Sequence, residues 1–303
     1  MDLFVRLRIA LAATATISLL ATAALAGPTD PVTVESPPTG QGDAFVPGVR
    51  TVDELPKEYV EEEYFVSGTA DLFSYANDPP LGPTDLATVD TDIPYKTRII
   101  VRRPKNHGQF KGTVVIEWWN STAGFDTAPV WDPSAEYFAR NGVVYVGVTN
   151  ANQSMSFLTG GCSLLGVLPP TCGTRYSTLS LPDDGLAYDM VSQIANLLNS
   201  GSPENPLPNK FDVERIYHAG QSQQGGSMVT YASAFHFPVN DGYFVQQAAT
   251  ARPVNFGPAC GAAGSPPFPD CTPRLQFPDS LVRTDLPVPV VHAITETDIE
   301  VLF

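Results

Sequence analysis

The stretch from residue 213 to residue 235 constrains the fold of this chain more than any other. An apolar run ends in Gly220-Gln221-Ser222, and two further glycines follow within the next four residues. Apolar residues then return at helical spacing: Met228, Val229, Tyr231, Ala232 and Phe235. This pattern predicts a strand, a tight turn centred on a serine, and a helix that starts close to the strand.

A serine in such a turn is a candidate nucleophile, because the turn strains the serine and projects its hydroxyl from the sheet edge. The usual motif is G-x-S-x-G, whereas here Gln224 stands two residues after Ser222 and Gly225 comes only afterwards. A glycine-rich loop in which Ser222 caps the helix is therefore the alternative. We favour the nucleophile, because a strand precedes the serine and a helix and an acidic residue follow it.

Composition narrows the class of protein. The chain has 303 residues, enough to bury a sizeable core, and its 43% of hydrophobic residues excludes wholesale disorder. Its formal net charge of -15 repels phosphate backbones, so nucleic acid is not an expected partner. The 29 prolines indicate long ordered loops laid over a scaffold.

The N-terminus has the pattern of a secretory signal peptide. Arg6 and Arg8 precede an apolar run, and Ala24-Leu25-Ala26 supplies small residues before Gly27. We expect residues 1–26 to be cleaved and the protein to be secreted or periplasmic. The alternative is an uncleaved membrane anchor; no other stretch is long enough to span a bilayer. Residues 27–57 then form an extended lead-in segment, and residues 58–303 form one domain.

Export favours disulfides among the four cysteines. The simplest of the three possible connectivities joins Cys162 to Cys172 and Cys260 to Cys271. Each bridge closes a short loop rich in proline or glycine. Metal binding is the alternative, but these cysteines lack C-x-x-C spacing and nearby histidines, so we expect no metal site.

From residue 58 onward, predicted strands alternate with predicted amphipathic helices, which indicates an α/β fold whose mainly parallel sheet is covered by helices on both faces. Residues 61–63 are expected to be a solvated edge and residues 76–92 a loop. The basic residues of the strand at 95–103 are expected on its solvent face. The remaining predictions are strands at 64–70, 112–118, 142–149, 213–221, 242–247 and 288–294, and helices at 133–141, 183–200 and after Ser222.

Two long insertions interrupt this alternation, at about residues 151–181 and 250–287, and each contains one cysteine pair. Both follow sheet strands on the same edge as Ser222. Long loops in a compact domain usually have a function, so we expect them to line or cover a substrate pocket. Inert surface decoration is the alternative.

A nucleophilic serine needs a base, an acid that orients the base, and donors for the oxyanion. The acid is expected after the strand at 288–294, where Asp298 is the first choice and Glu296 the second; a capped strand end is the alternative. One oxyanion donor is the backbone N–H of Gln223. The second is expected after the strand at 112–118, around Asn120.

The base is not evident. In enzymes built on this turn the order along the chain is serine, acid, histidine, yet all four histidines precede Asp298: His107, His218, His236 and His292. We expect His107 in a solvated turn, and His218 and His292 at packed positions in two strands. His236 is expected at the end of the helix after Ser222, where a positive charge is favourable. We therefore expect this chain to be a fragment that lacks the last strand, the base histidine and the final helix.

Several stretches resemble exported bacterial proteins labelled "alpha/beta hydrolase domain-containing", within the α/β-hydrolase superfamily. They are residues 64–70, 112–120, 220–225 and 295–298. The resemblance implies a hydrolase fold, Ser222 as nucleophile, Asp298 as acid and a histidine further along the chain. It also implies cleavage of a small-molecule carboxylic ester through an acyl-enzyme, without a cofactor. A peptidase or amidase on the same fold, or a non-catalytic secreted binding protein, are the alternatives.

Overall fold

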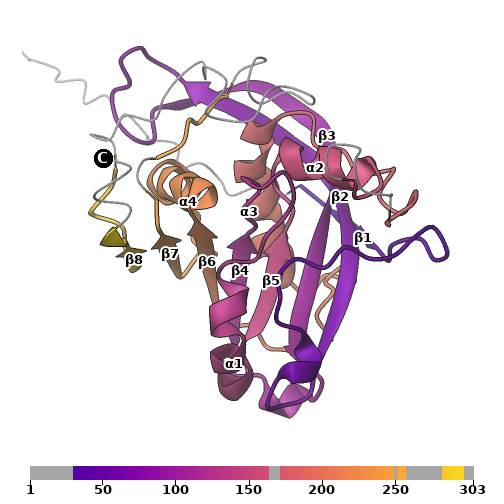
Figure 1. Ribbon diagram of the computed structural model, residues 1–303. Coiled ribbons are helices and arrows are strands. Elements are labelled where there is room, and N and C mark those ends of the chain that lie inside the picture. Colours follow the sequence, from indigo (N-terminus) through magenta and orange to yellow (C-terminus); the bar gives the residue numbers. More distant parts are fainter. Residues whose placement is uncertain (1–29, 164–170, 249–250, 257–281, 297–303) are drawn as a thin grey trace, which may run out of the picture.

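A single sheet of eight strands organises the computed structural model, which describes residues 30–163, 171–248, 251–256 and 282–296 (Figure 1). The strand order across the sheet is β1-β2-β3-β5-β4-β6-β7-β8. In chain order the strands are β1 (Thr33–Glu35), β2 (Tyr59–Tyr75), β3 (Leu86–Pro104), β4 (Thr113–Trp118), β5 (Val144–Val148), β6 (Arg215–Gln221), β7 (Gly242–Gln246) and β8 (Val290–Ala293).

The sheet is mainly parallel, as predicted. β5, β4, β6, β7 and β8 pair in parallel, whereas β1, β2 and β3 join through antiparallel pairs. The chain passes from β4 to β5 on one side and later returns to β6 on the other side of β4. This reversal is a topological switch point, and ligands of such sheets bind beyond the carboxyl ends of the strands there.

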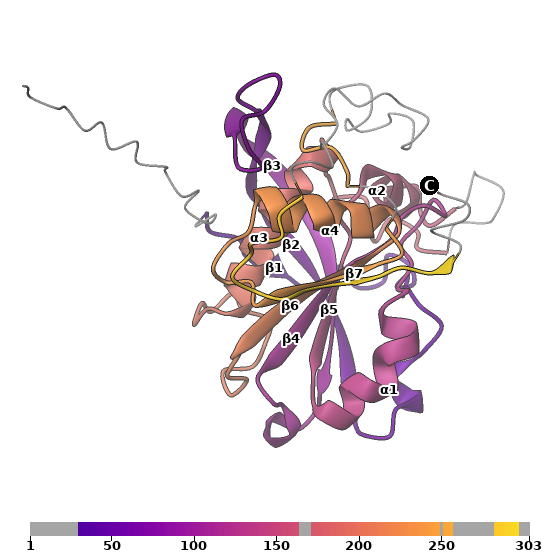
Figure 2. The same ribbon diagram turned by 90° about the vertical axis from the view of Figure 1, so that its left-hand side faces the viewer.

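Helices cover both faces of the sheet, also as predicted. In Figure 2, α3 and α4 lie on one side of the strands and α1 lies on the other. The α-helices are α1 (Trp131–Asn141), α2 (Asn152–Thr159), α3 (Ala187–Leu198) and α4 (Gln223–Ala234), and the 3-10 helices are η1 (Val52–Glu54), η2 (His107–Gln109) and η4 (Asp184–Leu186).

Successive side chains of the central strands point to opposite faces of the sheet, which explains this layering. In β4, Val114, Ile116 and Trp118 belong to the large core cluster that also contains Met228 and Tyr231 of α4. A smaller cluster on the other face includes Trp119, Trp131 of α1 and Tyr145 of β5. A strand buried on both faces reads as a continuous apolar run, which is why β4 and β5 were predictable.

The β2–β3 hairpin is longer than predicted. Its pairing runs from Tyr59↔Pro104 to Tyr75↔Leu86, so the prediction of a loop over residues 76–92 is wrong for the part from Leu86 onward. That part of β3 is largely exposed and rich in Asp and Thr. Composition therefore suggested a loop, whereas backbone pairing with β2 makes it a strand.

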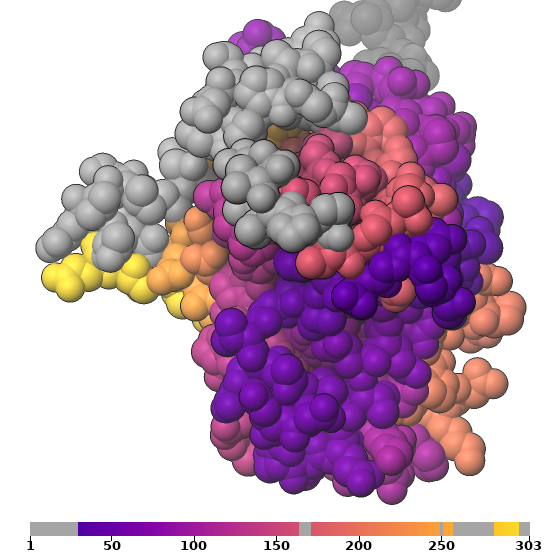
Figure 3. Space-filling view, turned by 45° about the vertical axis from the view of Figure 1, so that its right-hand side comes forward, coloured from indigo at the N-terminus to yellow at the C-terminus, as the bar shows by residue number. Residues whose placement is uncertain are grey.

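The predicted solvent face of β3 is instead buried, and this prediction is wrong. Arg98 and Arg102 are both 0% exposed. The lead-in segment lies over this side of the molecule (Figure 3). Its carbonyl groups at Phe45 and Pro47 accept hydrogen bonds from Arg98 and Arg102. An amphipathic strand shows which residues share a face, but it does not show which face another segment covers.

The acidic run at residues 61–63 is likewise not a solvated edge. Glu61 and Glu62 pair across the hairpin with Arg102 and Arg103. Glu63 pairs with Arg98 of β3 and with an arginine of the 151–181 insertion. These carboxylates therefore compensate buried or half-buried guanidinium groups.

The predicted bridge between Cys162 and Cys172 is present, with a Cα–Cα distance of 5.4 Å. It closes a loop of the 151–181 insertion, which also contains α2. Cys260 and Cys271, residues 1–26 and most of the 250–287 insertion lie outside the described residues. Within the described part of the chain, no helix is both long and apolar enough to cross a membrane.

Candidate active site

Ser222 stands between β6 and α4 in a strained conformation. Its φ is 54° and its ψ is -116°, a region that residues other than glycine rarely adopt. Its N–H donates to the carbonyl of Gln246 in β7 at 2.9 Å, and its own carbonyl accepts the N–H of Gly226 at 3.0 Å. Ser222 occupies the N-cap position, but its hydroxyl makes no capping hydrogen bond. The predicted strand, turn and helix are thus present, and the hydroxyl is not used as a helix cap.

Two glycines permit the close approach of α4 to the sheet. A Cβ on Gly220 would lie 2.4 Å from the carbonyl oxygen of Gln224. A Cβ on Gly225 would lie 2.8 Å from the Cβ of Ala248 and 2.9 Å from the carbonyl oxygen of Gln246. The glycine three residues after Ser222 thus provides clearance between α4 and the end of β7.

The segment that follows β4 is tied to this turn by side chains. Asn120 Nδ2 donates to the carbonyl oxygen and to Oε1 of Gln221, both at 3.0 Å. Ser121 Oγ donates to Gln223 Oε1 at 2.8 Å. Because β4 and β6 are neighbours at the switch point, the segment around Asn120 and the turn around Ser222 lie against each other.

Thr127 fixes the orientation of the peptide between Asn120 and Ser121. Its N–H and its Oγ1 both donate to the carbonyl oxygen of Asn120, at 2.9 Å and 3.0 Å. In a trans peptide the N–H points opposite to the carbonyl, so the N–H of Ser121 points away from Thr127. Among the described residues, neither this N–H nor that of Gln223 donates a hydrogen bond. Such oriented, unused N–H groups can bind a developing negative charge.

The acid candidates follow β8. Glu296 is exposed, three residues beyond the end of the strand, and it makes no ion pair with any described residue. Asp298, the first choice, lies outside the described residues. β8 is separated from β6 by β7 alone, and its carboxyl end lies at the same edge of the sheet as Ser222.

His218 is a packed residue in β6, as expected. Its Nδ1 accepts the indole N–H of Trp118 at 3.2 Å, so Nε2 carries the proton and donates to Asn240 Oδ1 at 2.8 Å. Burial lowers the pKa of His218 to about 4. Both ring nitrogens are occupied, and His218 is therefore a structural histidine.

The other three histidines are also not bonded to Ser222. His107 is exposed in η2, as expected. His236 bonds to the hydroxyl of Tyr243 at 2.8 Å, and burial and Arg283 lower its pKa, which disfavours the positive charge expected there. His292 is exposed in β8, so its predicted packed position is wrong, because β8 forms the edge of the described sheet.

Glu117 is a chemically unusual residue that the sequence did not single out. It is fully buried in β4, and burial raises its pKa to about 7, partly opposed by hydrogen bonds. Its carboxylate accepts the N–H groups of Val130 and Trp131 at 2.8 Å and 2.9 Å and the hydroxyl of Tyr145 at 2.8 Å. Glu117 thereby holds the beginning of α1. An acidic residue within a continuous apolar run was the available signal.

Among the described residues, no group of three or more histidine, cysteine, aspartate or glutamate side chains is placed to hold a metal ion. At this edge of the sheet the described residues offer the hydroxyl of Ser222 and the N–H groups of Ser121 and Gln223, which donate no hydrogen bond among the described residues.

Solved structures with a similar fold include a putative dienelactone hydrolase from Klebsiella pneumoniae subsp. pneumoniae MGH 78578, at 12% identity and a TM-score of 0.35, over 78% of each chain. A CE15 glucuronoyl esterase from Teredinibacter turnerae T7901 matches at 11% identity and a TM-score of 0.35, over 74% of this chain and 46% of its own. Acetyl xylan esterase 1 from Thermoanaerobacterium sp. JW/SL YS485 matches at 14% identity and a TM-score of 0.33, over 72% of this chain and 53% of its own.

This chain thus spans about half the length of the two esterases. No curated protein matches its sequence. A family model described as "Alpha/beta hydrolase domain" matches residues 32–303, which include every described strand and helix. The chain therefore belongs to the α/β-hydrolase family.

Proposed function

We propose that this protein is a serine hydrolase that cleaves carboxylic esters through an acyl-enzyme on Ser222. The observation that carries the proposal is the strained serine at φ 54°, whose neighbours include N–H groups without partners among the described residues. Such strain persists where the surrounding structure enforces it, and it is common at functional sites. Membership of the α/β-hydrolase family supports the same chemistry.

In the proposed reaction, Ser222 Oγ attacks the ester carbonyl carbon while its proton passes to a base. The tetrahedral oxyanion accepts hydrogen bonds from the N–H of Gln223 and from an N–H of the Asn120–Ser121 segment. Collapse of this intermediate breaks the bond to the alcohol, which leaves with the proton returned by the base. Water then repeats the sequence on the acyl-enzyme and releases the carboxylic acid.

We propose that Asp298, or Glu296 as second choice, orients the base. The base would be a histidine other than the four of this sequence. This is supported by the positions of the four histidines described above, none of which bonds to Ser222. Histidine is the side chain best suited to accept and return a proton near neutral pH.

We also propose that the protein is exported after removal of residues 1–26 and works outside the cytoplasm. The bridge between Cys162 and Cys172 is compatible with an oxidising compartment. Ester cleavage is proposed over amide cleavage on the basis of the sequence resemblance. A peptidase or amidase with the same residues is the second candidate, and a non-catalytic binding protein is the third.

A fluorophosphonate probe, which reacts with activated serines, tests the proposal on the protein expressed from its full open reading frame. We expect labelling of wild type, loss of labelling in Ser222→Ala, and unchanged labelling in Ser227→Ala. Ser227 is the matched control, because it lies in the same helix and is 5% exposed. Absence of labelling in folded wild type would contradict the enzyme and favour the binding protein. Turnover of an anilide faster than the matched ester would favour the amidase.

A further inference from the structure

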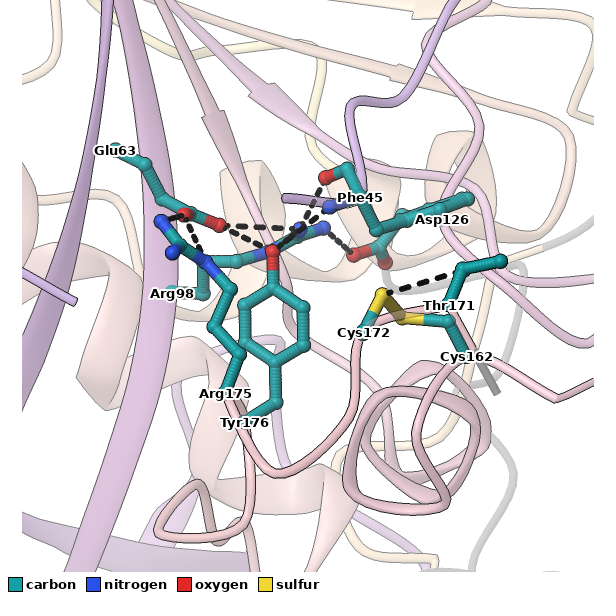
Figure 4. The surroundings of a disulfide bond; sticks show 9 residues. All are labelled: Phe45, Glu63, Arg98, Asp126, Cys162, Thr171, Cys172, Arg175 and Tyr176. Carbon is teal, nitrogen blue, oxygen red and sulfur yellow. Dashed lines mark hydrogen bonds and ion pairs between the residues drawn. A yellow bond between two sulfur atoms is a disulfide. The ribbon is translucent and has the colours of Figure 1, made fainter. Parts of the chain in front are cut away.

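Arg98 of β3 contacts both ends of the segment that leads from β4 to Asp126. Its guanidinium carbon lies 5.1 Å from the centroid of the Trp119 ring, at the start of this segment. Its Nη2 donates to Asp126 Oδ2 at 2.7 Å, at the end of the segment, and both side chains are 0% exposed (Figure 4). One buried cation thus bridges residues 119 and 126.

Thr149, directly after β5, completes this contact. Its Oγ1 donates to Asp126 Oδ2 at 2.6 Å and accepts from Arg98 Nε at 3.3 Å. Its N–H donates to the carbonyl of Arg98 at 3.0 Å. We call Arg98, Asp126 and Thr149 the clamp. It joins β3 and the end of β5 to the segment that contains Asn120 and Ser121.

The clamp is adjacent to the peptide that carries the proposed oxyanion donor. Asp126 precedes Thr127, which holds the carbonyl of Asn120 by two hydrogen bonds. A displacement of Asp126 therefore moves Thr127, and with it the direction of the Ser121 N–H. Oxyanion stabilisation requires donors that are already aimed before the charge develops.

The surroundings of Arg98 keep its charge in place. Burial alone would lower the pKa of Arg98, but Asp126, Tyr176 and Glu63 together raise it. Tyr176 donates to Glu63 at 2.6 Å and belongs to the loop that follows the disulfide (Figure 4). An apolar side chain would fill a buried site at less desolvation cost than a buried ion pair. A buried guanidinium that bonds at fixed geometry to both Asp126 and Thr149 is therefore suited to orienting the segment that contains Asp126.

We propose that Arg98 is a positioning residue for ester hydrolysis: through Asp126 and Trp119 it holds the Asn120–Ser121 peptide in the orientation that binds the oxyanion. This inference rests on the proposed function and names a residue outside the serine, acid and base. Arg98 does not touch substrate in this scheme. Its effect is on the transition state rather than on ester binding.

The test compares Arg98→Met, Arg98→Lys and Asp126→Asn with wild type, expressed from the full open reading frame, using 4-nitrophenyl acetate. Loss of one oxyanion donor lowers kcat by roughly 100- to 1,000-fold. A misaimed donor is expected to lower kcat by about 10- to 100-fold with KM within about twofold. Arg98→Lys keeps the charge but lacks the planar, multiply donating guanidinium, so we expect it to restore little of kcat.

Arg102→Met is the matched control. Arg102 lies on the same face of β3, is equally buried, and packs on the Trp131 ring at 4.4 Å. It bonds to Glu61 and Pro47 and makes no hydrogen bond to residues 119–126. We expect a loss of stability but no selective loss of kcat in the folded fraction.

A double variant tests whether a low kcat in the single variants arises only from misfolding. Arg98→Met with Asp126→Leu removes both charges, so it is expected to fold better than either single variant, yet to keep the low kcat. Deuterium exchange of residues 119–127 is expected to quicken in this variant while exchange in α3 stays unchanged. Folded clamp variants with wild-type kcat, or an equal loss in Arg102→Met, would overturn the inference.

Fluorophosphonate labelling separates this failure from failure of the proposed function. If wild type hydrolyses the ester through Ser222 and the clamp variants do so equally well, only the role of Arg98 is refuted. If wild type neither hydrolyses the ester nor reacts with the probe, the serine hydrolase and the positioning role are refuted together.

Discussion

Replacing Glu117 by glutamine should remove a specific dependence of stability on pH. In the folded protein the pKa of Glu117 is raised from 4.5 to about 7 by burial, whereas in the unfolded chain it has its ordinary value. Between these two values the folded state holds a proton that the unfolded state has lost. The free energy of unfolding of wild type therefore falls as pH rises through this window, because stability rises with pH only where the unfolded state binds more protons.

The magnitude follows from the shift itself. One pKa unit corresponds to about 1.4 kcal/mol, so a rise from 4.5 to about 7 predicts a loss on the order of 3 kcal/mol across the window. Asp184 and Asp189, whose pKa values are also raised by desolvation, contribute to the pH dependence of the stability of wild type as well. They are present in both proteins, so the difference between wild type and Glu117→Gln isolates Glu117.

Urea unfolding followed by tryptophan fluorescence measures this difference at pH 4.5, 6 and 8. Glu117→Gln should be less stable than wild type at pH 4.5, because its amide places an N–H₂ group against the backbone donors of Val130 and Trp131. The gap should narrow by pH 8. Glu136→Gln, on the exposed side of α1, should follow wild type throughout. If the free energies of unfolding of wild type and Glu117→Gln changed in parallel with pH, the raised pKa of Glu117 would be refuted.

Three further predictions concern the turn, the disulfide and the oriented peptide. Gly225→Ala should cost about 1–3 kcal/mol of unfolding free energy through overpacking, because the added Cβ would lie 2.8 Å from its nearest neighbour. Gly201→Ala is the control: its Cβ would meet nothing within 4 Å, so the variant should be near neutral in the same urea assay. Opening the Cys162–Cys172 bridge by serine substitution at both positions should cost roughly 2–3 kcal/mol for a loop of this length, and an unchanged unfolding midpoint would count against it. Thr127→Val removes one of the two hydrogen bonds to the carbonyl of Asn120, so kcat for an ester should fall by roughly 3- to 10-fold with little change in KM; a rise in KM alone would contradict the orienting role.

The turn around Ser222 was predictable because its signals are local. An apolar run, a glycine and a helical pattern follow one another within residues 213–235, and no distant contact is needed to recognise them. The role of Gly225 was harder to predict from the sequence. Only the contacts of Gly225 with Gln246 and Ala248 show that the position three after the serine provides the clearance.

The residues that hold the site were not predictable, since their roles depend on contacts distant in sequence. Arg98 and Arg102 stand at even spacing in β3 and so share one face of the strand. Basic residues on one face of a strand are equally the pattern of a solvated face. Their burial arises because residues 45–47 lie over that face and supply carbonyl acceptors. Glu117 gave a clearer signal, because an acidic residue inside a buried strand requires partners, but the sequence does not identify Tyr145 and the start of α1 as those partners.

The segment between β4 and α1 shows how the proposed oxyanion donor could be oriented without a glycine-rich loop. Residues 119–123 contain no glycine, and side chains from several elements fix this segment instead. Arg98 contacts it at Trp119 and Asp126, Glu117 holds its end at Val130 and Trp131, and Asn120 itself bonds to Gln221. Arg98 lies in β3, Glu117 in β4 and Gln221 in β6, so loosening one of these contacts leaves the others in place. Variants of a single anchor should therefore lose oxyanion stabilisation in part, whereas variants that remove two should lose more than the sum of the single effects.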